Sequence, residues 1–222
     1  VERTQFATFD RVIVSSPSDL HHPSTSLVRS PHVMPDRVPQ RPAEPDLDIV
    51  FVGRMSYRAN VEAIEFFARN VLPLIHRSRP DVRLHVVGAD PTRQVRRLAN
   101  DGIVVHGRVE SVVDFYRRAR VSIVPVQAAT GVQMKLIESL YMGVPTVCTP
   151  VTASQAGIEP GTHCLTATDP RQWSSAVLDL LSAGPEAGQM ARAGAAWASS
   201  AYRRDTIESD LLGVVRGIEG VS

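Results

Sequence analysis

The chain has 222 residues, with 24 Lys and Arg against 23 Asp and Glu, a formal net charge of +1. This length supports one large domain, or one domain and a fragment of another. The balanced charge excludes an electrostatic reason to expect nucleic acid, and it leaves at most peripheral contact with a membrane. Because we find no signal peptide and no apolar run of transmembrane length, we expect a cytoplasmic protein.

Cysteine and histidine spacing gives little sign of a metal centre. Cys148 and Cys164 fall on predicted strands and indicate buried thiols, which suits a reducing compartment. His21, His22 and His32 are close in sequence, but the adjacent pair faces opposite ways in any regular element. The sequence therefore predicts no metal and no cofactor.

The first 46 residues differ in composition from the rest. Asp10–Ser15 is a short apolar run typical of a strand, and Ser16–Asp19 has the composition of a helix start. Pro31–Pro45 is rich in proline and polar residues, which indicates a linker. We expect a short strand–helix–strand unit and a linker before the main domain.

From Asp48 onward, strand and helix patterns alternate, which predicts an α/β fold with a Rossmann-like parallel sheet and helices on both faces. The predicted strands are Ile49–Gly53, Leu84–Gly88, Ile103–His106, Val121–Pro125, Val144–Cys148 and Cys164–Ala167. The predicted helices are Asn60–Arg77 with a bend at Pro73, Pro91–Asn100, Val112–Ala119, Gly131–Met142, Pro170–Ser182, and about Pro185–Ser200 and Tyr202–Ile218.

One stretch carries the pattern of an anion site. After the strand that ends at Pro125, a small, polar loop leads into the helix predicted from Gly131. The first N–H groups of this helix, at Gly131–Met134, have no partner within it and carry the positive end of its dipole. A phosphate could bind there.

Lys135 and Glu138 lie on the polar face of this predicted helix, and Lys135 is the only lysine of the chain. Lys135 would add positive charge beside a phosphate, and Glu138 could accept hydrogen bonds from vicinal sugar hydroxyls. The alternative is a surface i,i+3 ion pair worth about 0.2–0.5 kcal/mol. The helix alone leaves both interpretations open.

Other candidate residues follow predicted strands. Gly53, Gly88, Gly107 and the loop before Gly131 all come at carboxyl ends of strands, where open parallel sheets bind their ligands. We therefore expect the four glycines to line one cleft.

The spacing Gly131-x-x-x-Lys135-x-x-Glu138-(x)4-Gly143-x-Pro145-x-Val147 resembles the donor-site signature of the retaining glycosyltransferases of family 4, which have the two-domain GT-B fold. That family's other landmarks are resembled, in order, by Phe51–Arg54, Leu84–Gly88, Val104–Gly107 and Val121–Pro125. The resemblance covers most of the chain, from about Asp10 to Leu181.

The resemblance implies a division of the chain. Residues 1–46 would be the end of an N-terminal acceptor-binding domain and its linker, 47–200 the C-terminal, nucleotide-sugar-binding domain, and 201–222 a C-terminal helix. The family's linker usually carries Pro-Asn-Gly, where this chain has Pro31-His32-Val33. Activity would require an N-terminal domain, a partner chain that supplies one, or a homo-oligomer formed through residues 1–46.

The implied reaction is transfer of a sugar from a nucleoside diphosphate sugar to an acceptor hydroxyl, with retention and without a metal. Glu138 would hold donor hydroxyls, while Lys135 and Arg54 neutralise the departing diphosphate. An alternative role of Arg54 is an ion pair with Asp90 or Glu138. The other expected donor-binding residues are Gly53, Asn60, Gly88, His106, Gly107, Thr130, Gly131, Val132, Gln133 and Met134.

Three positions bear on this assignment. Asn60 stands where the family commonly has lysine, although a subset has asparagine. Thr130 replaces the first of two family glutamates, so it offers a hydroxyl but no negative charge. His106 and Arg108 flank the expected nucleobase pocket, where the family uses mostly backbone contacts, and recognition by these side chains stays open.

Competing classes lack their motifs. No G-x-G-x-x-G follows a strand, no G-x-x-x-x-G-K-[ST] is present, and no catalytic triad order stands out. The surroundings of Lys135 do not resemble the pyridoxal phosphate lysine of glycogen phosphorylase. Two alternatives remain, a non-catalytic nucleotide-sugar-binding subunit of a split transferase and a sugar-nucleotide epimerase, which shares the fold.

Overall fold

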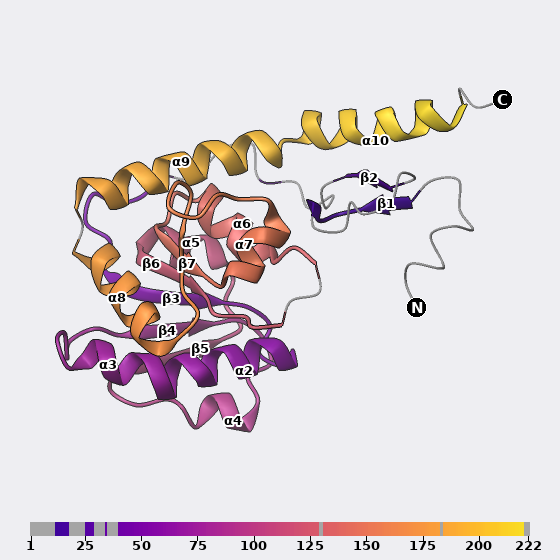
Figure 1. Ribbon diagram of the computed structural model, residues 1–222. Coiled ribbons are helices and arrows are strands. Elements are labelled where there is room, and N and C mark those ends of the chain that lie inside the picture. Colours follow the sequence, from indigo (N-terminus) through magenta and orange to yellow (C-terminus); the bar gives the residue numbers. More distant parts are fainter. Residues whose placement is uncertain are drawn as a thin grey trace.

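The computed structural model describes residues 12–17, 25–28, 34, 40–128, 131–182 and 184–219 (Figure 1). Its main body is a six-stranded parallel sheet in the order β5-β4-β3-β6-β7-β8, with helices on both faces. This confirms the predicted fold class. The strands are β3 (Leu47–Val52), β4 (Leu84–Val87), β5 (Ile103–Gly107), β6 (Ala119–Val124), β7 (Thr146–Cys148) and β8 (Leu165–Thr166).

The order of the strands reverses direction between β3 and β6, which makes a topological switch point near the centre of the sheet. From β3 the chain adds β4 and then β5 on one side, and it returns with β6 on the other side of β3. Ile49 of β3 accordingly pairs with Leu84 of β4 and with Val121 of β6. Ligands of doubly wound sheets bind at such a switch point, beyond the carboxyl ends of the strands.

Apolar stripes on the helices cover both faces of the sheet. One face carries α2 (Arg58–Phe66), η3 (Phe67–Val71), α3 (Leu72–His76) and α8 (Pro170–Leu181), and the other α5 (Val112–Arg118) and α6 (Met134–Tyr141). Helix α9 (Pro185–Ala201) packs over α6, while α4 (Arg93–Arg96) and α7 (Pro150–Ala156) are short. Trp173 of α8 is fully buried and meets Phe67 edge-on, with ring centroids 6.0 Å apart.

Element boundaries differ from the predictions in places with clear causes. The helix predicted over Asn60–Arg77 widens into a π-turn at η3, immediately before Pro73, whose missing N–H and bulky ring disturb the regular hydrogen bonds. The helix predicted over Pro91–Asn100 is limited to α4, which Thr92 caps through Val95 N–H. Cys148 and Cys164 are buried as predicted, with their sulfurs 3.7 Å apart.

Two short strands precede the main body. β1 (Val12–Val14) pairs in parallel with β2 (Thr25–Leu27), as expected for a strand–helix–strand unit, and Ser16 Oγ donates to the Gln155 carbonyl of α7 at 2.8 Å. The connection at 18–24, the Pro31-His32-Val33 sequence and all three histidines considered as metal ligands lie outside the described residues.

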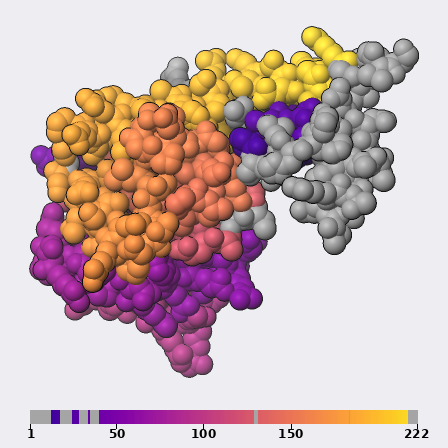
Figure 2. All heavy atoms as spheres, in the orientation of Figure 1, coloured from indigo at the N-terminus to yellow at the C-terminus, as the bar shows by residue number. Residues whose placement is uncertain are grey.

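Helix α10 (Arg204–Glu219) continues the direction of α9 and extends beyond the main body, beside β1 and β2 (Figures 1 and 2). Ile207 at its start is buried, whereas Leu212 and Val215 are about half exposed. In the described part of the chain, no helix is long and apolar enough to cross a membrane.

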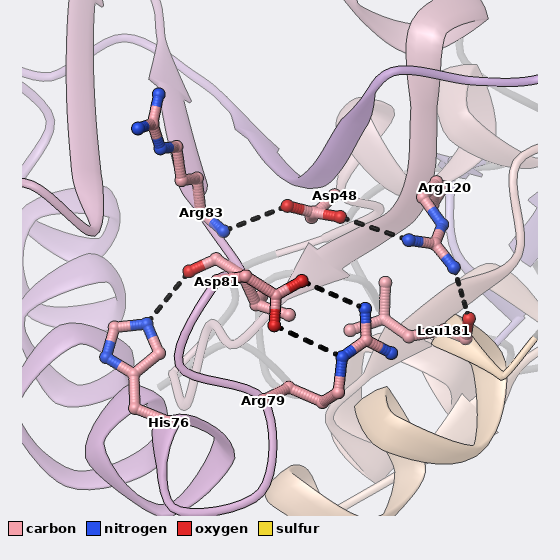
Figure 3. Close-up of polar contacts among 8 residues, drawn as sticks. Asp48, His76, Arg79, Asp81, Arg83, Arg120 and Leu181 are labelled. Carbon is pink, nitrogen blue, oxygen red and sulfur yellow. Dashed lines mark hydrogen bonds and ion pairs between the residues drawn. The ribbon is translucent and has the colours of Figure 1, made fainter.

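Polar side chains brace the amino ends of the strands (Figure 3). Asp48 of β3 accepts hydrogen bonds from the Arg83 backbone N–H at 3.0 Å and from Arg120 Nη1 at 3.2 Å. Arg120 Nη2 donates to the Leu181 carbonyl at the end of α8, at 2.5 Å. One carboxylate therefore joins β3 to the segment before β4 and, through Arg120 of β6, to α8.

Arg41 serves the same edge of the sheet. Its guanidinium donates to the carbonyls of Ala119 and Gly143, which lie just beyond the ends of α5 and α6. Burial lowers the pKa of Arg41, but its charge is compensated by the negative ends of these helices.

Candidate active site

Three of the predicted glycines lie side by side where neighbouring strands end. Gly53 N–H donates to the Val87 carbonyl at 3.0 Å, and Gly88 N–H donates to the Gly107 carbonyl at 2.9 Å. A Cβ on Gly88, which has φ +147°, would lie 1.8 Å from the Gly53 carbonyl oxygen. Glycine permits this approach because it has no Cβ. The carboxyl edge therefore presents bare backbone.

Lys135, in the first turn of α6, reaches the same edge. A Cβ on Gly53 would lie 3.2 Å from Lys135 Cε, and Lys135 Nζ lies 5.9 Å from the ring centroid of Phe51. Nζ donates to Gln133 Oε1 at 3.0 Å, so a neutral amide holds the ammonium. Burial lowers the pKa of Lys135 from 10.5 to about 8, while Glu138 acts in the opposite direction.

The start of α6 differs from the prediction. The helix begins at Met134 and not at Gly131, which has φ +82°, while Gln133 is extended with φ −83° and ψ 102°. A left-handed glycine and an extended residue cannot continue a right-handed helix. The positive end of the dipole therefore lies at Met134 and Lys135, one turn later than expected.

The remaining residues of this loop are placed unevenly. Val132 and Met134 are partly buried and pack against the core, and Gln133 Nε2 donates to the Gly131 carbonyl at 3.4 Å. Thr130, predicted to contact the donor, lies outside the described residues.

Glu138 lies one turn after Lys135 and meets a tyrosine that the sequence reasoning missed. Tyr116 of α5 is 1% exposed, and its hydroxyl lies 3.3 Å from Glu138 Oε2 and 3.2 Å from the Lys135 carbonyl. Burial and the Glu138 charge raise the pKa of Tyr116, so the phenol keeps its proton. The only signal in the sequence was one tyrosine in an otherwise ordinary helix pattern.

Asn60, in α2, carries a buried amide near the carboxyl end of β3. It is 4% exposed, and its Nδ2 donates to the Arg54 carbonyl at 2.9 Å. Its Oδ1 is buried without a hydrogen-bond partner among the described residues. A Cβ on Gly53 would lie 2.8 Å from Asn60 Nδ2, so the glycine makes room for the amide. An unpaired buried acceptor is costly and often marks a ligand-binding position.

Arg54 adopts the alternative role considered for it. Its Nε lies 3.3 Å from Asp90 Oδ2, and the two side chains are 69% and 50% exposed. An exposed pair of this kind contributes about 0–1 kcal/mol. Arg54 can therefore exchange Asp90 for a phosphate at little cost.

A pocket of about 510 Å³ opens beside Gly107, beyond the ends of β4 and β5. It is lined by Asp90, Pro91, Arg96, Ala99, Val105, His106, Gly107 and Arg108. His106 also lies 3.0 Å from Nδ1 of His85, through its Nε2, and stacks on that ring. Burial lowers the pKa of both histidines, and the nearby positive charge of Arg118 lowers both pKa values further.

The strand order and the helices on both faces of the sheet define a Rossmann-like domain of the GT-B type. The family model described as "Glycosyl transferases group 1" matches residues 46–183, more than half of the chain. The chain therefore belongs to the group 1 glycosyltransferases. Among curated proteins, none matches the sequence.

Solved structures agree on the fold. Sucrose-phosphate synthase from Thermosynechococcus elongatus superposes with a TM-score of 0.78 at 20% identity, over 100% of this chain and 61% of its own. HepE from Anabaena, solved with UDP and glucose, gives 0.75 at 12% identity, over 96% and 65%. TarM from S. aureus gives 0.76 at 12% identity, over 96% and 45%. The chain spans less than two thirds of each of these proteins.

Proposed function

We propose that this chain binds the donor of a retaining glycosyltransferase, which transfers a sugar from a nucleoside diphosphate sugar to an acceptor hydroxyl. The observation that carries the proposal is the approach of Lys135, at the start of α6, to within contact of Gly53, at the switch point between β3 and β6. A helix N-terminus, a half-buried lysine and bare strand-end backbone together suit a diphosphate. UDP complexes of HepE and TarM support this ligand class.

The chemistry follows from where charge develops. The bond between the anomeric carbon and the β-phosphate oxygen breaks as the acceptor hydroxyl oxygen bonds to that carbon. Negative charge grows on the departing diphosphate, which takes up the proton of the acceptor hydroxyl. Lys135, Arg54 and the dipole of α6 neutralise this charge, which stabilises the transition state without a metal. Glu138 accepts hydrogen bonds from hydroxyls of the donor sugar, and it thereby orients the anomeric carbon toward the acceptor.

The pocket beside Gly107 would take the nucleobase. It lies next to the glycine edge, and a base stacked near His106 would place its ribose and diphosphate toward Gly53 and Lys135. Arg96 and Arg108, which also line this pocket, supply hydrogen-bond donors.

The acceptor half of the active site would come from an N-terminal domain, joined to this chain or carried by a partner. Exposed apolar residues at the far end of the molecule suit this partner: Ile13 of β1 is 53% exposed, and Leu212 and Val215 of α10 are 52% and 50% exposed. A non-catalytic subunit of a split transferase is the second candidate. It is favoured by Thr130, which stands where the resembled family has a glutamate.

Binding and transfer assays test the proposal. Glu138→Ala should weaken the binding of a nucleoside diphosphate sugar more than that of the matching nucleoside diphosphate. The variant loses contacts to sugar hydroxyls that are worth about 1–3 kcal/mol. Equal losses for the two ligands would indicate a structural role for Glu138. The chain alone should bind donor without transferring sugar, and transfer on addition of an N-terminal domain would identify the enzyme. Turnover by the isolated, monodisperse chain would contradict the need for that domain.

A further inference from the structure

Tyr116 links α5 to the part of α6 that carries the candidate site. Its ring is buried in the core, and its hydroxyl reaches the Lys135 carbonyl at 3.2 Å and Glu138 Oε2 at 3.3 Å. Residues three apart lie on the same side of a helix, so one phenol can contact both. The contact fixes the first turn of α6 and the Glu138 side chain at the same time.

The chemistry of the phenol decides what it does there. A hydroxyl carries one proton, and a carboxylate is a stronger acceptor than a peptide carbonyl. Tyr116 keeps this proton because burial and Glu138 raise its pKa, as described above. The protonated phenol therefore donates to Glu138 Oε2.

Glutamate has three rotatable side-chain bonds, and ordering such a side chain on binding costs affinity. A carboxylate can accept about four hydrogen bonds, so one bond from Tyr116 leaves capacity for sugar hydroxyls. We infer that Tyr116 is a positioning residue, whose hydroxyl holds the Glu138 carboxylate in the orientation that meets the donor sugar. This inference rests on the proposed function of Glu138.

The test removes the hydroxyl and keeps the ring. Tyr116→Phe is compared with Tyr202→Phe, a matched control, because Tyr202 is also 1% exposed but follows α9, which carries none of the proposed donor contacts. The probes are the sugar nucleotide that most stabilises the wild-type protein among UDP-glucose, UDP-N-acetylglucosamine, GDP-mannose and ADP-glucose, and the corresponding nucleoside diphosphate. Titration calorimetry measures both dissociation constants.

We expect Tyr116→Phe to weaken the binding of the sugar nucleotide about 5- to 10-fold, as for loss of one ordinary hydrogen bond, and that of the nucleoside diphosphate less than about twofold. Tyr202→Phe should change neither. Adding Tyr116→Phe to Glu138→Ala should have no further effect on the sugar nucleotide, because the residue acts through the carboxylate.

Four results would overturn the inference. Equal weakening of both ligands by Tyr116→Phe would show that the hydroxyl only supports α6, and additive effects with Glu138→Ala would show that it acts independently. An unchanged sugar nucleotide affinity in Tyr116→Phe, with a selective loss in Glu138→Ala, would remove the role of Tyr116 and leave the proposed function intact. If none of the four probes binds the wild-type protein, both fail together.

Discussion

The two edges of the central sheet use their polar groups in opposite ways. At the amino edge, Asp48 binds Arg120, and Arg120 and Arg41 donate to carbonyls at the ends of three helices. At the carboxyl edge, backbone is left bare by Gly88, and Asn60 Oδ1 is buried with no hydrogen-bond partner in the described part of the chain. Polar groups at the amino edge hold the elements of the domain together, whereas the carboxyl edge is where we propose that the ligand binds.

Adding a side chain at Gly88 should have the largest effect on stability. In Gly88→Ala the new Cβ would lie 1.8 Å from the Gly53 carbonyl oxygen at φ +147°. The clash forces the ends of β3 and β4 apart, so we expect a loss of about 3 kcal/mol or more in the free energy of unfolding. Gly161→Ala is the control, because Gly161 has φ +85° but open space around it, and it should cost only about 1 kcal/mol. Denaturant unfolding measures both, and equal losses would contradict the close approach.

Breaking the amino edge should reduce stability without affecting the ligand. Asp48→Ala leaves the Arg83 N–H and the partly buried Arg120 without their acceptor, which should lower the free energy of unfolding by about 1–3 kcal/mol. Asp81→Ala removes an exposed partner of Arg79 and should lower the free energy of unfolding much less than Asp48→Ala does. Affinity for a nucleoside diphosphate should stay the same in both variants. A selective loss of affinity in Asp48→Ala would contradict the assignment of ligand binding to the carboxyl edge alone.

Lys135 should show the reverse behaviour. Its burial already opposes the charge, so Lys135→Gln should leave the free energy of unfolding nearly unchanged while weakening a nucleoside diphosphate about tenfold. Calorimetric titration and denaturant unfolding on the same preparations separate the two quantities. A large loss of stability with unchanged affinity would assign Lys135 to the core.

The pH dependence gives the same residue a second signature. The pKa of Lys135 in the folded protein is about 8, so its charge is present below pH 8 and is lost as the pH rises through that value. Affinity for a nucleoside diphosphate should therefore fall as the pH rises above 8, by about tenfold in all, the same factor as for Lys135→Gln. Lys135→Gln should lack this fall. Between about pH 8 and 10.5 the unfolded chain binds more protons than the folded one, so the free energy of unfolding should rise with pH.

The smallest effect is expected at Arg54. Because its pair with Asp90 is exposed, Arg54→Ala should change the free energy of unfolding by less than about 1 kcal/mol and weaken a nucleoside diphosphate only about threefold. Asp90→Asn releases the arginine and should leave binding unchanged or slightly stronger. Weaker binding in Asp90→Asn would place Asp90 itself among the ligand contacts.

Periodicity and glycine spacing were sufficient to predict the parallel sheet and the positions at which its strands end. Alternating strand and helix patterns specify a parallel sheet, and Gly53, Gly88 and Gly107 mark the carboxyl ends of its strands, where Gly88 approaches the backbone of Gly53. The start of α6 was misplaced because apolar spacing shows the period of a helix but not the residue at which the backbone turns helical. Gly131 has the left-handed conformation that a helix cannot include.

Contacts between elements were beyond the sequence. The hydrogen bond of Tyr116 to Glu138 and the stacking of His85 on His106 join residues about 20 positions apart, on different elements. Their meeting depends on how α5, α6, β4 and β5 pack, which no local pattern encodes. The role of Arg54 stayed open for the same reason, because the sequence alone does not decide whether its side chain lies beside Asp90.

The most direct test of the account is an amide NMR titration with the sugar nucleotide that binds most tightly. We predict that the largest shifts occur at the carboxyl edge, in the N–H signals of Gly53, Gly88, Gly107 and Met134, and that the signals of Asp48 and Arg83 at the amino edge remain in place. Shifts centred on the amino edge, or spread evenly over both edges, would contradict the assignment of the ligand to the carboxyl ends of the strands.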